Sequence, residues 1–223
     1  VIKSISFDGK QGESVAIVGS TGSGKSTIVK LLSKLYDGYG GSIKFGDQEL
    51  RDLSAEAVRS SISIVPQDIV IFDGTISYNI GLGITGITYD QIELAAQIVG
   101  ADIFINQFPD RYDHRILERG ANLSHGQRQL IAFARALCKK PDFVILDEAT
   151  SSVDPASERQ IQDALLQIFS KKTVIAIAHR LSTIKECDKI IVLEKGEIAE
   201  QGSHDTLISR QGRYYELISE FSS

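Results

Sequence analysis

A glycine-rich stretch at residues 19–27 constrains this chain more than any other feature. It reads G-S-T-G-S-G-K-S-T and fits the template G-x-x-x-x-G-K-[ST], with its basic and hydroxyl positions at Lys25 and Ser26. Glycines can take φ > 0 and leave no side chain in the way, so successive backbone N–H groups can surround an anion. The stretch therefore predicts a loop that cradles phosphates, with Lys25 as a point charge and Ser26 as a ligand for Mg²⁺.

The residues on either side of this loop make the match specific. The apolar run 15–18 is typical of a buried parallel strand, and apolar residues at helical spacing follow the loop at Ile28, Leu31, Leu32 and Leu35. A strand, a loop and a helix then follow one another, and the helix points the positive end of its dipole at the phosphates. The alternative, a glycine-rich surface turn, explains neither the Lys-Ser pair nor the flanking elements.

Size and composition are those of an ordinary globular protein. The chain has 223 residues, enough for one large or two small domains, with 42% hydrophobic and 24% charged residues. A formal net charge of −5 gives no electrostatic reason to expect a nucleic-acid partner. No apolar run approaches the ~20 residues that cross a bilayer, and no signal-peptide pattern opens the chain, so we expect the chain itself to be soluble.

The cysteines and the first residue point to the protein's setting. Cys138 and Cys187 lie far apart without metal-ligand or redox spacing, which favours a reduced compartment and buried, inert thiols. The chain begins at Val1 and contains no methionine. It therefore looks like part of a longer protein.

Apolar periodicity and turn residues predict a mixed α/β chain. Strands are expected over 1–7, 41–46, 62–66, 143–146 and 173–178, with a hairpin over 190–201. Helices are expected over 53–61 with Ser54 as cap, over 91–99 and 102–107, after Leu123, after Pro155, and along a terminal stripe of Tyr214, Leu217, Ile218 and Phe221. Residues 74–137 are mostly helical, with a polar loop at 108–122, and predict a helical subdomain inserted into an α/β core.

Polar residues follow three of the predicted strands directly. Gln67 follows the strand 62–66, Asp147 and Glu148 end the strand 143–146, and His179 follows 173–178. At the carboxyl edge of a parallel sheet, Gln67 and Asp147 could hold Mg²⁺, Glu148 could activate water, and His179 could contact a phosphate or position water. An exposed loop amide and an exposed helix cap are the alternatives for Gln67 and for the Asp-Glu pair.

A second helix start can bind an anion. Ser124 is a reasonable cap for the helix that follows Leu123, and its hydroxyl, the Gly126 amide and the helix dipole together favour negative charge. Periodicity alone favours an ordinary capped helix here. Asp154 is likewise placed to cap the helix that begins at Pro155.

In this order the motifs resemble the nucleotide-binding domain of ATP-binding cassette (ABC) transporters along nearly the whole chain. The family's Walker A loop, Q-loop, signature motif, Walker B strand with catalytic glutamate, D-loop and H-loop correspond here to residues 19–27, Gln67, 123–127, 143–148, Asp154 and His179. Residues 118–120 are similar to the exporter X-loop, and 148–154 and 178–183 resemble exporter forms. The resemblance implies one ABC ATPase domain over 1–223: a P-loop NTPase core of about 1–73 and 138–223 with a mostly parallel sheet, an N-terminal antiparallel β subdomain, and a helical subdomain of about 74–137.

The resemblance also implies ATP and Mg²⁺ and assigns their contacts. The metal ligands would be Ser26, Gln67 and Asp147, and the catalytic residues Glu148, His179, Lys25 and Gln67. The nucleotide would be held by Gly19, Ser20, Thr21, Gly22, Ser23, Gly24, Lys25, Ser26 and Thr27, and by Ser124, Gly126, Gln127 and Asp154, the signature residues coming from a second copy.

Partners and location follow from the same resemblance. We expect two copies to pair head to tail as a homodimer. We also expect a transmembrane domain in the same polypeptide, which would place this domain at the cytoplasmic face of a membrane, and we expect no nucleic-acid partner. Two departures matter: His125 stands where the signature usually has glycine, and the aromatic residue that stacks on adenine would lie before Val1, which predicts weaker ATP binding by this chain. A soluble ABC ATPase of DNA repair or translation and a low-turnover regulatory half remain as alternatives, and the sequence does not identify the cargo.

Overall fold

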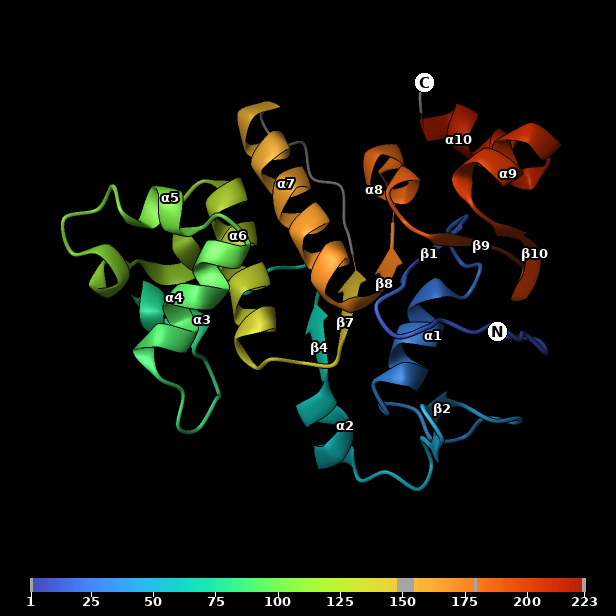
Figure 1. Ribbon diagram of the computed structural model, residues 1–223, viewed down its shortest axis with the longest axis horizontal. Helices are drawn as coiled ribbons and strands as arrows, with labels where there is room; N and C mark the ends of the chain where they lie inside the picture. Colours follow the sequence, from blue (N-terminus) through green and yellow to red (C-terminus); the bar gives the residue numbers. More distant parts are fainter. Residues whose placement is uncertain (1, 148–154, 179, 222–223) are drawn as a thin grey trace.

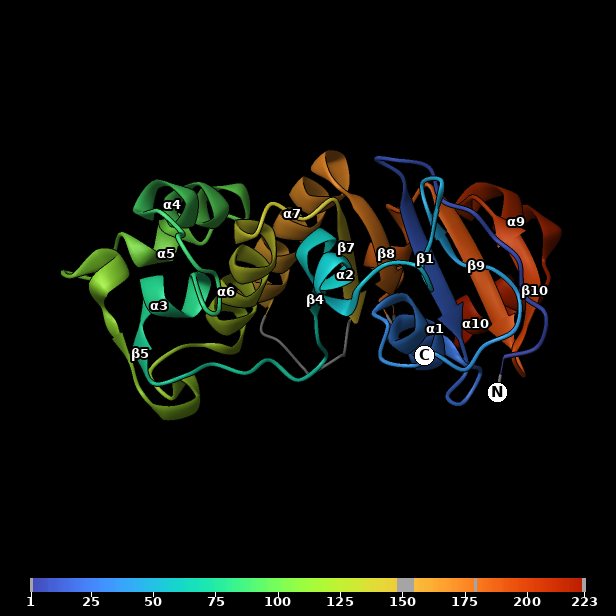
Figure 2. The ribbon, with the colours of Figure 1, turned by 90° about the horizontal axis from the view of Figure 1, so that it is seen from below.

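A six-stranded sheet forms the centre of the computed structural model, which describes residues 2–147, 155–178 and 180–221. Figure 2 shows the strands side by side, with β10 at one edge and β4 at the other. Their order is β10 (Glu197–Gly202), β9 (Lys189–Glu194), β1 (Ser14–Gly19), β8 (Thr173–Ile177), β7 (Phe143–Asp147) and β4 (Ile62–Val65). Only β10 runs antiparallel to its neighbour. The predicted α/β fold with a mostly parallel sheet is confirmed.

Both faces of the sheet are buried, which explains why its strands read as continuous apolar runs. All six residues of β1 are buried. Because successive side chains of a strand point to opposite faces, Val15 and Ile17 pack into one hydrophobic cluster and Ala16 and Val18 into the other.

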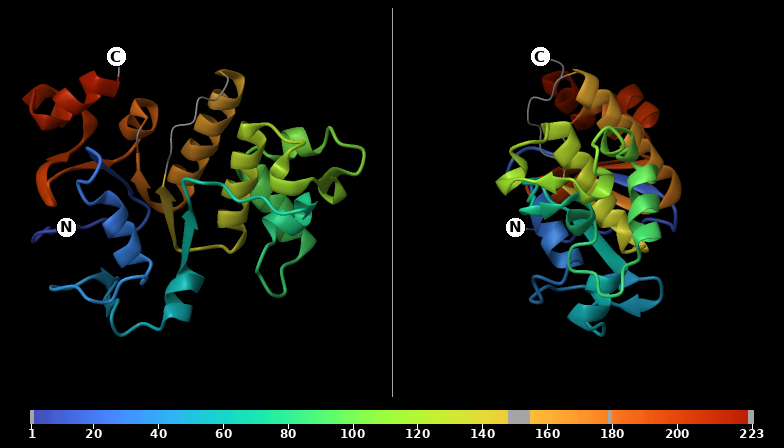
Figure 3. Two further views of the ribbon diagram at one scale, coloured as in Figure 1. Left: turned by 180° about the vertical axis from the view of Figure 1, so that it is seen from behind. Right: turned by 90° about the vertical axis from the view of Figure 1, so that its left-hand side faces the viewer.

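Helices cover each face (Figures 1 and 3). One face packs against α1 (Lys25–Leu32), α2 (Ala55–Ser61) and the small antiparallel pair β2 (Lys44–Phe45) and β3 (Gln48–Glu49). The other packs against α6 (His125–Cys138), α7 (Pro155–Lys171), α8 (Leu181–Lys185), α9 (His204–Arg210) and α10 (Arg213–Phe221). The predicted cap of α2 is confirmed, because the Ser54 hydroxyl accepts a hydrogen bond from the Ala57 amide at 3.0 Å.

A group of helices lies beyond the β4 edge, at the left of Figure 1. It consists of α3 (Ile76–Ile80), α4 (Tyr89–Ile98) and α5 (Asp102–Ile105), which pack with α6. The two-stranded pair of β5 (Gly74–Thr75) and β6 (Arg115–Ile116) closes the group. The same hydrophobic cluster runs from these helices into the sheet, so α6 joins the two regions through shared side chains.

The strand expected over residues 1–7 is wrong for the described part of that range. Residues 2–13 form no strand. Ser4 has φ of 42°, which interrupts an extended run, and the segment makes a single backbone hydrogen bond to the hairpin, from the Lys3 amide to Gly196 O at 2.8 Å. Between β1 and β4 the antiparallel pairing is the short β2–β3 pair, which represents the predicted N-terminal antiparallel β subdomain.

Two further expectations differ in detail. The first helix ends at Leu32, so Leu35, expected on its apolar face, is 68% exposed. The polar loop predicted over 108–122 contains β6 and two 3-10 turns, Arg111–Asp113 and Glu118–Gly120. Strand β6 exists because Arg115 and Ile116 pair with the distant residues Thr75 and Gly74, a pairing that local sequence patterns do not reveal.

Other expectations are confirmed. The terminal stripe packs back onto the core, with Tyr214, Leu217 and Ile218 all buried. Cys138 and Cys187 are both buried free thiols. Among the described residues, no helix has the length and apolar character needed to span a membrane.

Candidate nucleotide-binding site

The glycine loop connects the carboxyl end of the central strand β1 to the first turn of α1. Gly19, Gly22 and Gly24 have φ of 152°, 81° and 115°, which favour glycine over residues with a side chain. At Gly19 space matters as well, because a Cβ there would overlap the carbonyl oxygen of Leu193 in β9. The loop can therefore turn tightly between β1 and the neighbouring strand only with these glycines.

Lys25 is the charged centre of the loop. Its residue is only 7% exposed, and Nζ donates hydrogen bonds to the backbone oxygens of Gly19 at 2.6 Å and Ser20 at 3.1 Å. Burial lowers the pKa of its ammonium group, and the nearby Asp147 carboxylate partly opposes that shift. The ammonium group is thus held at the loop by weak carbonyl acceptors, which phosphate oxygens would outcompete as partners.

The rest of the loop offers polar groups that could bind an anion together with a metal cation held by oxygen ligands. Ser23 Oγ is buried without a hydrogen-bond partner among the described residues, so the loop contains a polar atom that its own fold leaves unsatisfied. Ser26 is exposed in the first turn of α1, where its hydroxyl is accessible. The backbone amides at the start of α1 favour negative charge.

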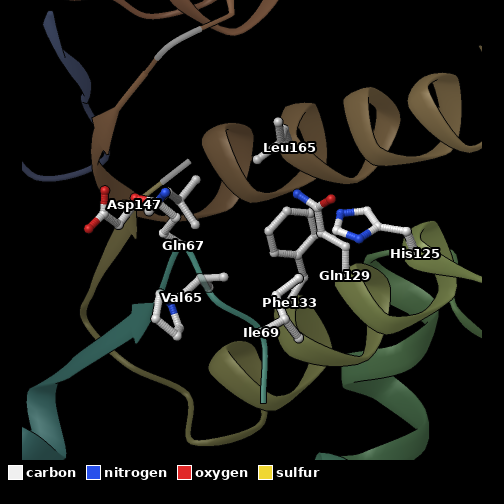
Figure 4. Close-up of a pocket in the computed structure, with 10 residues that line it drawn as sticks. Val65, Gln67, Ile69, His125, Gln129, Phe133, Asp147 and Leu165 are labelled. Atoms are coloured by element: carbon white, nitrogen blue, oxygen red, sulfur yellow. The ribbon is translucent and has the colours of Figure 1, made fainter. Parts of the chain in front are cut away.

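Gln67 and Asp147 meet at one pocket beside this loop. Figure 4 shows Asp147 at the end of β7 and Gln67 after β4 at one end of the pocket, and His125 and Gln129 of α6 at the other. The donor set suits Mg²⁺, which prefers amide, hydroxyl and carboxylate oxygens. No cluster of three or more His, Cys, Asp or Glu residues that could hold a metal occurs in the described ranges, so a Zn²⁺-type centre finds no support there.

The start of α6 is a capped helix end that packs tightly on α7. The Ser124 hydroxyl accepts from the Gln127 amide at 3.1 Å, and Gln127 Oε1 accepts from the Ser124 amide at 2.9 Å, forming a capping box. Behind it, a Cβ on Gly126 would lie 2.6 Å from Ser157 Cβ. Burial lowers the pKa of the His125 imidazole, and the charges of Arg128 and Arg180 lower it further.

Sequence reasoning missed the residues that hold the segment after Gln67. Asn79 is fully buried. Its Oδ1 accepts a hydrogen bond from Phe72 N at 2.9 Å, and its Nδ2 donates to Phe72 O at 2.9 Å and to Thr75 O at 3.1 Å. Arg135 of α6 donates to Val70 O at 2.8 Å and Asn79 O at 2.7 Å. The signal in the sequence was an arginine on the otherwise apolar face of α6.

Comparison with known proteins now identifies the family. The family profile described as ABC transporter matches residues 2–151. The chain belongs to the ABC transporter family. It is 46% identical over 217 residues to the ATP-dependent lipid A-core flippase of Legionella pneumophila (strain Paris), covering 97% of this chain and 37% of that protein.

Two more similar proteins sharpen the assignment. The chain is 43% identical to a probable multidrug resistance ABC transporter ATP-binding/permease protein, YheH, of Bacillus subtilis (strain 168), covering 97% of this chain and 32% of that protein. A solved bacterial Atm1-family ABC exporter with ATP bound superposes with a TM-score of 0.89 at 40% identity, covering all of this chain and 39% of that one. The predicted resemblance to an exporter-type ABC nucleotide-binding domain is confirmed. The chain spans about a third of the length of the curated relatives that it matches.

Three of the predicted ABC site residues, Glu148, Asp154 and His179, lie outside the described residues. The strands that lead to two of them are placed: β7 and β8 pair side by side, with Asp147 opposite Ile177. The described site residues form two groups, the loop with Asp147 and Gln67, and the signature helix end with Ser124, Gly126 and Gln127.

Proposed function

We propose that this chain binds ATP with Mg²⁺ and hydrolyses it to drive transport by an ABC exporter. The observation that carries the proposal is the glycine loop with its buried Lys25, set within electrostatic reach of Asp147. Loop amides and Lys25 would surround the outer phosphates, and the loop residues from Gly19 to Thr27 would exclude water from them. Ser26, Gln67 and Asp147 would ligate Mg²⁺, which when bound spreads the negative charge that develops on the phosphates.

Hydrolysis would depend on two residues at the ends of neighbouring strands. Glu148 would accept a proton from the attacking water while the water oxygen bonds to the terminal phosphorus and the bond to ADP breaks. His179 would orient that water or donate to the terminal phosphate. Lys25 and Gln67 would hold the reacting groups in line.

Completion of the site would require a second copy. Ser124 is exposed at the start of α6. Together with Gly126, Gln127 and Asp154 of the same chain, it would close over ATP held by the loop of the other chain. This pairing gives the α6 end a use that one chain alone does not supply. We propose a homodimer, with a core of about 1–73 and 138–223 and a helical subdomain of about 74–137 in each copy.

The remaining partner would be a transmembrane domain in the same polypeptide. The name of the Bacillus relative joins ATP-binding and permease functions, and the relatives are about three times as long as this chain. The segment after Gln67, fixed to α6 by Asn79 and Arg135, would face that domain at the cytoplasmic side of a membrane.

Variants at three positions test the proposal by separating binding from hydrolysis. Glu148→Gln should lower ATP turnover by roughly 10²–10⁴ while ATP still binds, because only proton transfer is removed. His179→Ala should also slow turnover, and Lys25→Ala should abolish ATP binding. Turnover by steady-state phosphate release and ATP binding by equilibrium dialysis would be measured for each variant. Full turnover in Glu148→Gln would refute its role.

A further inference from the structure

A second pocket lies away from the phosphate loop, where three helices meet. The outer face of α4 forms one wall, and the carboxyl-terminal ends of α6 and α7 form the others. On α4 the wall consists of Gln91, Leu94, Ala95 and Ile98, which share one helix face by their spacing. The stripe runs over eight residues, Gln91 to Ile98, or about 10 Å of helix.

The floor of this pocket is apolar and partly open to solvent. Leu137 of α6 and Ile168 of α7 are buried beneath it, while Leu94 is 51% exposed at its mouth. Cys138 also lines the floor, but burial raises the pKa of its thiol to about 11, so it is no nucleophile at neutral pH. The pocket therefore offers contact area for an apolar group and no reactive centre.

Positive charge gathers at the rim. Lys140, Lys171 and Lys172 line the pocket, and its ten described lining residues include no carboxylate, although the chain carries a net charge of −5. Lys172 Nζ donates to Pro141 O at 2.8 Å. Lys140 and Lys171 are exposed. An anion at the rim would meet two flexible ammonium groups whose stems can lie along the apolar wall.

We propose that this pocket binds a single-chain amphiphile with an anionic head, of the fatty-carboxylate type. Its chain would lie along Leu94, Ala95 and Ile98, where burial of its CH₂ groups is favourable, and its carboxylate would contact Lys140 and Lys171. The site is separate from the pocket of Gln67 and Asp147, because the two share no lining residue.

Titration of the 223-residue chain with decanoate, without ATP, tests this proposal. Binding would be followed by calorimetry and by amide chemical shifts of α4 and of the α6 and α7 ends. We expect one saturable site, with shifts confined to these helices, and at least about tenfold weaker binding of decanol and of decyltrimethylammonium, a difference of ~1.4 kcal/mol. Equal binding of all three probes, or no saturation by decanoate, would overturn the proposal.

Matched variants identify the head-group contact. The double variant Lys140→Glu, Lys171→Glu should bind decanoate at least about tenfold more weakly, whereas Lys10→Glu, Lys44→Glu, which changes net charge equally at other exposed positions, should bind as the parent does. Both variants should keep the parent's ATP affinity, which separates this site from the proposed function. Equal loss in both variants, or binding only to vesicles of phosphatidylglycerol, would contradict a single-chain ligand at this pocket.

Discussion

Lys25 shows how a functional residue can be unfavourable for folding in isolation. Its ammonium group is buried against two carbonyl oxygens, and burial outweighs the attraction of Asp147, so its pKa falls below the usual 10.5. The charge is placed for a polyanion that supplies the missing compensation. The loop therefore stores an electrostatic cost that ATP binding would relieve.

This cost predicts a pH-dependent stability. Because the folded-state pKa is lowered, the unfolded chain binds more protons between that value and 10.5, and the free energy of unfolding rises with pH in this window. Relative to Lys25→Met, the parent should gain stability as pH rises from the lowered folded-state pKa of Lys25 toward 10.5, by at most ~1.4 kcal/mol per pH unit. Urea unfolding of both proteins at several pH values measures this difference, and a flat or falling difference would contradict it.

Single residues also show why parts of the site could be predicted. Gly19, Lys25 and Ser26 are fixed by local chemistry, and the capping box of Ser124 and Gln127 needs only residues three apart, so sequence patterns identify them. The role of Arg135 could not be predicted, because it donates to backbone oxygens of Asn79 and Val70 that lie 56 or more positions away in the sequence. The role of Asn79 depends on the same contact and was missed with it.

At the level of elements, α6 and α7 approach each other closely near the start of α6. Gly126 allows this approach, because any Cβ would lie 2.6 Å from Ser157 Cβ and 2.8 Å from its Oγ. The predictable parts of the elements were those with strong periodicity, such as β1, α2 and the β9–β10 hairpin. The β5–β6 pair joins residues that are distant in the sequence and was not predicted, and the end of α1 at Leu32, before Leu35, was not predicted either.

The contact of α6 with α7 predicts a rescue between two substitutions. Gly126→Ala should lower the free energy of unfolding by about 1–3 kcal/mol, because the two helices must separate. In a Ser157→Gly background the same substitution should cost much less, since the atoms that its Cβ would meet are gone. Urea denaturation of the two single variants and the double variant measures the coupling. An identical loss in both backgrounds would show that steric contact is not the cause.

At the scale of the whole molecule, the sheet brings distant residues to one edge. Parallel strands β1, β4, β7 and β8 all end at the same side, and they deliver the glycine loop, Gln67 and Asp147 to neighbouring positions. The end of α6 with Ser124 forms a separate group on the same molecule. Under the proposed function, such a divided site would be complete only when two chains face each other.

ATP turnover measured against protein concentration tests whether two chains form the proposed site. Glu148→Gln is measured beside the parent, and the molecular mass of both is determined in the presence of ATP. We predict turnover that rises more than linearly with concentration, and a Glu148→Gln variant that loses turnover while an ATP-bound dimer accumulates. Turnover strictly proportional to protein concentration, with the Glu148→Gln variant monomeric at saturating ATP, would contradict the proposed ATP-bound dimer.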